Sequence, residues 1–238
     1  MSNWKAKRFW KEASVTEADD GFTVQLDGRP VRTPAKTLLV VPTRAMALAV
    51  ADEWDAQEGE IKPQTMPVTR SANAALDKVA QQHDEVAALI ADYGGTDLLC
   101  YRAPAPQELI ARQAAAWDPI LDWAEQSLGV RLICAEGVMH IAQDPEGQCV
   151  LQARVRAMDP FRLTAFHDLV SLSGSLVLGF AAVHDLLPPQ QIWALSRIDE
   201  LWQEEQWGAD DEATALAETK QMAFLHAKSF HDLCAPAF

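Results

Sequence analysis

The chain has 238 residues, of which 49% are hydrophobic and 23% charged, and its formal net charge at pH 7 is −14. This apolar content excludes an intrinsically disordered chain and is enough to build a core without disulfides. No CxxC pair is present, so the cysteines predict neither a zinc site nor a disulfide framework, and we expect reduced, mostly buried thiols. They are Cys100, Cys134, Cys149 and Cys234.

The net negative charge of the chain comes from the residues after 44. Residues 1–44 carry 8 Lys and Arg against 5 Asp and Glu, whereas the remainder carries 12 against 29. Because an acidic surface repels phosphate groups, a nucleic-acid partner is excluded and an anionic membrane surface is disfavoured. The basic start of the chain is followed by no apolar run, and Leu169–Val183 is too short to span a bilayer. We expect a cytoplasmic protein without stable membrane insertion.

The first forty residues show the period-two alternation of β-strands. Strands are predicted at Phe9–Val15, Phe22–Leu26, Val31–Thr33 and Thr37–Val41. Between the first two, Glu17–Gly21 is predicted as a turn. Asp27-Gly28 is a strong signal for a tight hairpin, because glycine accepts the positive φ of such a turn. A small antiparallel sheet is therefore predicted.

A helix and a domain boundary follow this sheet. Thr43 is predicted as the N-cap of a helix that runs to Gly59. Pro63 and Pro67 mark the next segment as a linker. The predicted fold class is α+β: a small α/β domain of residues 1–62, with an antiparallel sheet and a helix, and a larger, mainly helical domain of residues 63–238.

Helical periodicity dominates the second domain. Helices are predicted at 67–82, 83–92, 106–127, 161–184, 189–206 and 211–232. The segment Val130–Val155 could form two short strands, or a strand and a helix. In 161–184, Ser171, Ser175 and Gly179 recur every fourth residue and would let a neighbouring backbone approach closely. We therefore expect this apolar helix to be buried at the centre of a helical bundle.

The sequence offers one enzymatic hypothesis. It contains neither GxGxxG nor GxxxxGK[ST], so nucleotide hydrolysis and a nucleotide cofactor are not expected. Three His-Asp dipeptides, at 167–168, 184–185 and 231–232, would suit a metal-dependent phosphohydrolase. Against it, adjacent residues on a straight helix point about 100° apart. The alternative interpretation is a set of helix-end histidines beside solvated acids.

One position breaks the pattern of the helix predicted at 189–206. In projection, Glu205 falls on the apolar stripe, and such a violation often marks a functional site. The stripe consists of Leu195, Ile198, Leu201 and Trp202. The other interpretation is that Glu205 swings outward or pairs with an internal arginine such as Arg102 or Arg112. The pattern alone leaves both interpretations open.

An acidic concentration surrounds Glu205, with no Lys or Arg from residue 198 through residue 219. A charge run of this kind is usually a solvated face. Here it is interleaved with Trp202 and Trp207, so it also fits an apolar anchor with an acidic rim, as found at protein interfaces. Asp210 has a second possible role as the cap of the last helix.

Six stretches in this order resemble a known family. They are Gly21–Pro34, Glu53–Gln57, Met66–Thr69, Asp97–Ala103, Trp117–Pro119 and Trp207–Gly208. They are similar to the assembly chaperones of the F-type ATP synthase that protect its α subunit, known from mitochondria and alphaproteobacteria. The similarity extends over nearly the whole chain.

The resemblance implies two domains, no catalytic activity and no cofactor. It implies that the protein binds the unassembled α subunit and prevents its aggregation until the β subunit replaces it; we expect a monomer when free. An acidic residue of the helical domain is important in this family, and we assign that role to Glu205 first and Asp210 second. Trp202, Trp207 and Glu204 complete the predicted partner-binding set. Without a targeting presequence, the chain is expected to be a bacterial, cytoplasmic member.

Overall fold

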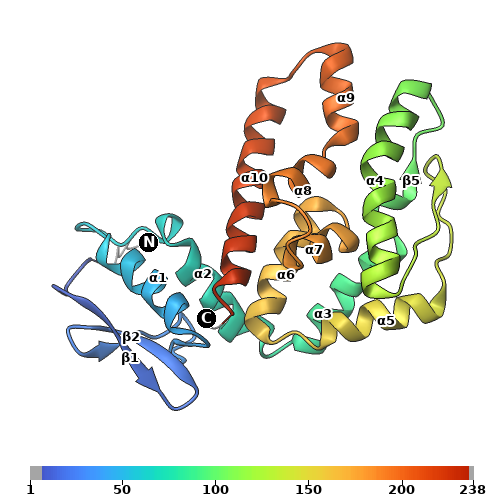
Figure 1. The fold of residues 1–238 in the computed structure, drawn as a ribbon. Helices are drawn as coiled ribbons and strands as arrows, with labels where there is room; N and C mark the ends of the chain where they lie inside the picture. The colour runs from blue at the N-terminus through green and yellow to red at the C-terminus, as the bar shows by residue number, and fades with distance from the viewer. Residues whose placement is uncertain (1–6, 236–238) are drawn as a thin grey trace. The chain divides into compact units, whose positions relative to one another are not determined.

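The computed structural model describes residues 7–235 and divides them into two compact units (Figure 1). The first unit takes the described residues up to Gln82, together with Asp159–Thr164 and those from Ser229 onward. The second takes His83–Met158 and Ala165–Lys228. The chain thus leaves the first unit and returns to it twice, which local composition does not reveal. The domain boundary placed at residue 62 from the sequence stays a prediction.

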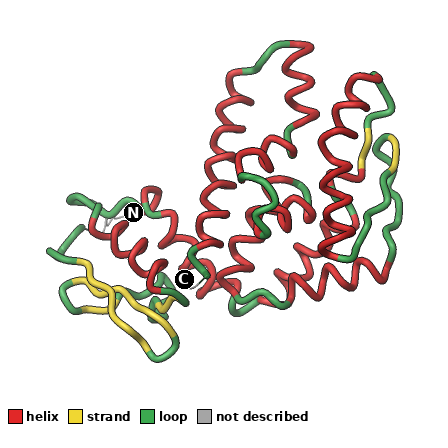
Figure 2. The backbone as a smooth tube through the Cα atoms, viewed as in Figure 1, coloured by secondary structure: helices red, strands yellow, loops and turns green. Residues whose placement is uncertain are grey.

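A small antiparallel sheet forms the core of the first unit, as predicted (Figure 2). Its strands are β1 (Ala13–Ala18), β2 (Gly21–Leu26), β3 (Arg29–Pro30) and β4 (Val40–Val41). β2 is central: it pairs with β1 over its whole length and with β3 and β4 on the other side. Asp27 and Gly28 both have positive φ, 47° and 78°, which confirms the predicted hairpin turn.

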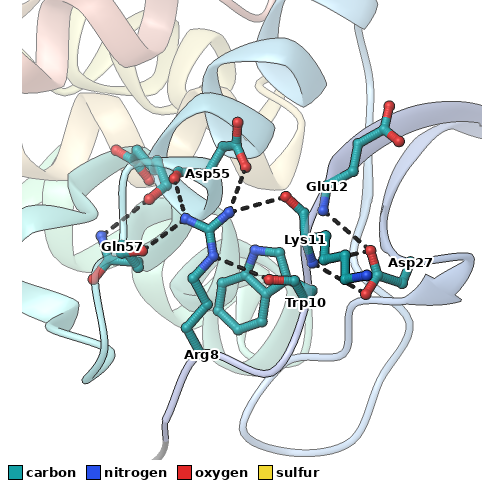
Figure 3. A network of polar contacts seen from close by, with 8 residues as sticks. Arg8, Trp10, Lys11, Glu12, Asp27, Asp55 and Gln57 are labelled. Atoms are coloured by element: carbon teal, nitrogen blue, oxygen red, sulfur yellow. Dashed lines mark hydrogen bonds and ion pairs between the residues drawn. The ribbon is translucent and has the colours of Figure 1, made fainter.

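The first strand begins later than predicted, because a polar network holds the segment before it (Figure 3). The Asp27 carboxylate accepts hydrogen bonds from the backbone N–H groups of Lys11 and Glu12, each at 3.1 Å. These bonds lower the pKa of Asp27. The Arg8 guanidinium donates to the carbonyl oxygen of Asp55 at 2.6 Å and so joins this segment to the first helix. β1 extends through Glu17, which was predicted to lie in the turn.

The segment after β3 is mostly a loop, contrary to the prediction of two further strands. Only β4 and an isolated bridge between Arg32 and Leu38 have strand pairing. A few backbone hydrogen bonds remain, such as that from the Leu39 N–H to the Val31 carbonyl oxygen at 3.0 Å. Asp77 also holds the loop: it accepts from the Thr33 hydroxyl at 2.6 Å and from the Ala35 N–H at 3.0 Å.

Helix α1 (Arg44–Asp55) covers the sheet. The Thr43 hydroxyl accepts from the Met46 N–H at 3.1 Å, which confirms Thr43 as the N-cap. The buried face of α1, from Met46 to Ala51, packs against β1 and β2. The helix ends four residues before the predicted end at Gly59. Two prolines then begin a short 3₁₀ turn (Pro63–Thr65) and α2 (Pro67–Ala74), which continues as a π-helical turn (Ala75–Val79).

The remaining elements are mainly helical. They are α3 (His83–Ala91), α4 (Gln107–Leu128), α5 (Pro145–Arg156), α6 (Pro160–Ser173), α7 (Leu176–Val183), α8 (Pro189–Leu195), α9 (Ile198–Trp207) and α10 (Asp211–Asp232), with 3₁₀ turns at Asp92–Gly95 and Leu98–Cys100. The ambiguous segment forms a strand, β6 (Ala135–Glu136), followed by α5. β6 pairs in parallel with β5 (Tyr101–Arg102). Within residues 7–235, no helix has both the length and the apolarity to cross a membrane.

The single helix predicted at 161–184 is two helices. Gly174 has a φ of 72°, and Ser175 caps α7 by accepting from the Leu178 N–H at 3.0 Å. The expected stripe of small residues is therefore wrong, since Ser171 is exposed and Ser175 is a cap. The apolar half, Leu176–Ala182, is fully buried, as predicted, and α7 packs against α4 and α8.

Gly179 is the position in α7 where a side chain has no room. A Cβ there would lie 2.6 Å from Cγ2 of Val170 and 3.2 Å from Cε2 of Phe166, and both side chains are buried. We expect Gly179→Ala to destabilise the protein by about 1–2 kcal/mol, because overpacking outweighs the better helix propensity of alanine. Chemical denaturation measures this. Gly95→Ala, where a Cβ would have open space, is the control and should be close to wild type; equal stability of all three proteins would contradict the prediction.

The helix predicted at 189–206 is also divided, at Ser196 and Arg197, into α8 and α9. One tertiary and one local hydrogen bond satisfy carbonyl groups at the end of α8. The Trp117 indole N–H donates to the Leu195 carbonyl oxygen at 2.8 Å, and the Ser196 hydroxyl donates to that of Trp193 at 2.7 Å. A projection of one straight helix is therefore wrong here, and Leu195 does not belong to the stripe that contains Glu205.

Candidate protein-binding surface

Helix α9 is flanked by two grooves of the second unit. The first, which we call the α4 groove, has a volume of about 330 Å³ and is lined by α9, the start of α4 and the segments around β5 and β6. The second, the α10 groove, has a volume of about 360 Å³ and lies between α9 and the start of α10. Figure 1 shows α9 beside α10, at the end where the short loop joins them. Trp207 and Gln203 line both grooves.

Trp207 is the most prominent apolar side chain of this surface. It is the last residue of α9 and is 79% exposed. Trp202, one and a half turns earlier, is half-buried and lines the α4 groove, where Val138 from the loop after β6 is 90% exposed. A large exposed aromatic side chain beside other apolar groups is typical of a protein-binding surface.

Glu205 forms an ion pair rather than lining either groove. Its Oε2 lies 2.7 Å from Nη1 of Arg112 on α4. The hydrogen bond from Arg112 lowers the pKa of Glu205. Arg102, the other arginine considered from the sequence, pairs with Asp118 at 2.8 Å. Because the side chains of Glu205 and Arg112 are 53% and 34% exposed, water screens their attraction, and the pair contributes little to stability.

The other two predicted acidic residues line the α10 groove. Glu204 lies 3.8 Å from Nη2 of Arg197, whose Nη1 binds Glu200 at 2.9 Å. Asp210 accepts from the Ala213 N–H at 2.8 Å and so caps α10, which confirms its structural role. The structure thus brings Glu204, Asp210 and Trp207 to the α10 groove, and Trp202 and Trp207 to the α4 groove.

The α4 groove contains a polar pair that sequence reasoning missed. Gln113 is buried; its Nε2 donates to Oδ1 of Asp199 at 2.6 Å, and its Oε1 accepts from the Ala103 N–H at 2.8 Å. This glutamine fixes α9 and the segment after β5 on α4. Since these residues are far apart in sequence, no local pattern signals them. For the groove wall itself, the sequence holds one signal: the adjacent apolar residues Val138 and Met139, in the segment left ambiguous, which are both exposed in the structure.

The three His-Asp dipeptides do not come together. Nδ1 of His167 binds the neighbouring Asp168 at 2.9 Å, and Asp185 pairs with Lys228 at 2.7 Å. Within the part of the chain that the structure describes, no group of three or more His, Cys, Asp or Glu could hold a metal ion. The phosphohydrolase hypothesis therefore gains no geometric support from residues 7–235.

The fold and the surface around Trp207 define a class: a mainly helical protein suited to binding another polypeptide. Comparison with known proteins supplies the family. The family model described as ATP12 chaperone protein matches residues 7–125, and the chain belongs to this chaperone family.

Solved structures and a curated relative agree with this assignment. An Asp-to-Lys variant of Atp12p from Paracoccus denitrificans is 48% identical, with a TM-score of 0.96 over 98% of this chain and 100% of that one. The Atu1473 protein from Agrobacterium tumefaciens is 42% identical, with a TM-score of 0.91 over 96% and 86%. "Protein atp12, mitochondrial" from Schizosaccharomyces pombe is 25% identical over 221 residues, which cover 87% of this chain and 75% of the relative. The predicted family resemblance and the α+β fold class are confirmed.

Proposed function

We propose that this protein is an assembly chaperone of the F-type ATP synthase that binds the unassembled α subunit. It prevents aggregation of that subunit and releases it when the β subunit takes its place. Membership in the ATP12 chaperone family, together with 48% identity to an Atp12p structure over almost the whole chain, is the observation that carries this proposal.

The exposed surface of α9 supports this function physically. A lone subunit of a permanent complex exposes a large apolar interface, and a reversible chaperone needs to cover roughly 1,000–2,000 Å² of it. Apolar side chains near the rim of the two grooves would supply the anchor, and acidic side chains would orient the partner. We assign this role to Glu205, Asp210, Trp202, Trp207 and Glu204.

In this proposal the chaperone acts only by binding its partner. Release needs only that the β subunit competes for the same face of the α subunit with a higher affinity, because differential affinity is sufficient to shift a binding equilibrium. The net charge of −14 favours solubility and fast encounter with basic patches. We place this activity in the bacterial cytoplasm, in keeping with the structural relatives from Paracoccus and Agrobacterium.

Light scattering of purified α subunit tests the proposal. Near-stoichiometric amounts of this protein should suppress aggregation without added nucleotide, and added β subunit should then move the α subunit into an α–β complex. Unchanged aggregation over a wide range of ratios would contradict the proposal.

Charge reversal of Glu205 tests the predicted site. Glu205→Lys places a cation against Arg112 and removes an acidic group from the surface, so suppression of aggregation should fall several-fold. The melting temperature should stay close to wild type, because the lost ion pair is exposed. Glu218→Lys makes the same change in net charge at an exposed position of α10 and is the matched control. Equal loss in both variants would show a general charge effect, and a collapse of the melting temperature would show that Glu205 is structural.

A further inference from the structure

Two of the four cysteines lie opposite each other in the second unit. Cys100 immediately precedes β5 and Cys134 immediately precedes β6. Because β5 and β6 are parallel, with Tyr101 opposite Ala135, the register places Cys100 opposite Cys134. Neighbouring strands are about 4.8 Å apart, which is within the range of Cα separations that a disulfide spans. Both cysteines are free thiols; Cys100 is buried, but Cys134 is exposed, contrary to the prediction of mostly buried thiols.

The surroundings make these two thiols chemically different. Nη2 of Arg102 lies 3.7 Å from Sγ of Cys134. Its guanidinium is held in place, since Nε donates to the Leu99 carbonyl oxygen at 2.9 Å and Nη2 pairs with Asp118 at 2.8 Å. A hydrogen bond from the Cys100 thiol and the charge of Arg102 lower the pKa of Cys134. The same hydrogen bond, burial and the Asp97 carboxylate raise the pKa of Cys100. The exposed sulfur is therefore the nucleophile, and the buried one keeps its proton.

We propose that Cys134 and Cys100 form a redox modification site, at which a hydroperoxide oxidises Cys134 and Cys100 then closes a disulfide between β5 and β6. In the first step the Cys134 thiolate attacks the peroxide, the O–O bond breaks, an alcohol or water leaves with a proton, and a sulfenic acid forms. In the second step the Cys100 sulfur loses its proton and attacks the Cys134 sulfur, the S–O bond breaks, and water leaves. Two thiols are oxidised by two electrons and one peroxide is reduced.

The site adjoins the α4 groove, since residues of β5 and of the loop after β6 line it: Tyr101, Arg102, Gly137 and Val138. A disulfide would tie β5, which lines this groove, to β6, whose following loop lines it. The other two cysteines serve as references. Cys149 on α5 is exposed like Cys134, whereas Cys234 is buried and burial raises its pKa to about 12. The inference does not depend on which polypeptide the surface binds.

The test uses the full chain in its native state. With limiting hydrogen peroxide, mass spectrometry of a non-reducing digest should find the Cys100 and Cys134 peptides joined. Iodoacetamide should label Cys134 at least about tenfold faster than Cys149. Cys149→Ser should leave the disulfide unchanged. Cys100→Ser should stop at a Cys134 sulfenic acid that dimedone traps.

Several other outcomes would overturn the proposal. These are a disulfide that includes Cys149 or joins two chains, a Cys134 sulfinic acid without any disulfide in the wild type, or equal labelling of Cys134 and Cys149. If Cys100→Ser does not fold, Cys134→Ser, a change at an exposed position, replaces it: it should abolish both the cross-link and the fast labelling.

Discussion

Replacing Trp207 with alanine should weaken binding of the α subunit by about tenfold or more. Trp207 is 79% exposed in the free protein and lies on both grooves, so a partner that covers α9 would bury it almost completely. Large aromatic side chains that become buried in this way dominate binding energies, with typical losses of about 2 kcal/mol or more on truncation. Binding can be measured by titration of labelled α subunit and by suppression of its aggregation.

The control for this variant is Met222→Ala. Met222 is 66% exposed on α10 but lines neither groove. Both variants should unfold within about 0.5 kcal/mol of wild type, because neither side chain contributes to the core. If Trp207→Ala binds as tightly as Met222→Ala, the partner does not use the end of α9, and the predicted binding set is wrong while the family assignment stands.

The largest effect on stability is expected at Asp97, in the second unit. Its carboxylate is fully buried; Oδ1 accepts from the Leu99 N–H and Oδ2 from the Val177 N–H, each at 3.0 Å. It therefore caps both the 3₁₀ turn that leads to β5 and the buried helix α7. Asp97→Ala leaves these buried N–H groups without their acceptor, which should cost about 2–5 kcal/mol. Chemical denaturation would show this as a lower midpoint with an unchanged slope, and a loss below about 1 kcal/mol would contradict the capping role.

Asp97 also predicts a pH dependence of stability. Burial raises its pKa from 3.8 to about 6 in the folded state, so between these values the folded protein holds a proton that the unfolded chain has lost. The stabilisation is complete below the unfolded pKa and is lost as the pH rises through the folded one. Between about pH 5 and pH 7 the loss should be about 1 kcal/mol. Free energies of unfolding of wild type and Asp97→Asn measure it: the difference between the two proteins should change with pH, and a constant difference would contradict the raised pKa.

Local hydrogen bonds account for the predictions that were confirmed. The Thr43 and Asp210 caps and the Asp27-Gly28 turn involve partners within a few residues, so the amino-acid types there nearly determine the geometry. The burial of Leu176–Ala182 was also predicted from local sequence, because the apolar content of this run is enough to require burial.

The candidate surface could be predicted only in part. Sequence patterns picked out Trp202, Trp207 and the acidic residues near them, because aromatic and acidic residues cluster in one short segment. They did not show the two grooves, since residues from β5, from the loop after β6 and from α4 supply one wall. Nor did they decide between the two interpretations of Glu205, which depended on the position of Arg112 on another helix.

The amino-acid sequence by itself determined the first hairpin, the caps at Thr43 and Asp210, the order of sheet and helices, and the family. Where two long helices break depends also on distant groups that local patterns do not show: Asp97 accepts from the Val177 N–H of α7, and Trp117 donates to the last carbonyl of α8. Tertiary structure alone decided that Cys100 meets Cys134 and that α9 lies between two grooves. Helix propensities differ by less than about 1 kcal/mol per residue, so a few buried hydrogen bonds from elsewhere in the chain outweigh them.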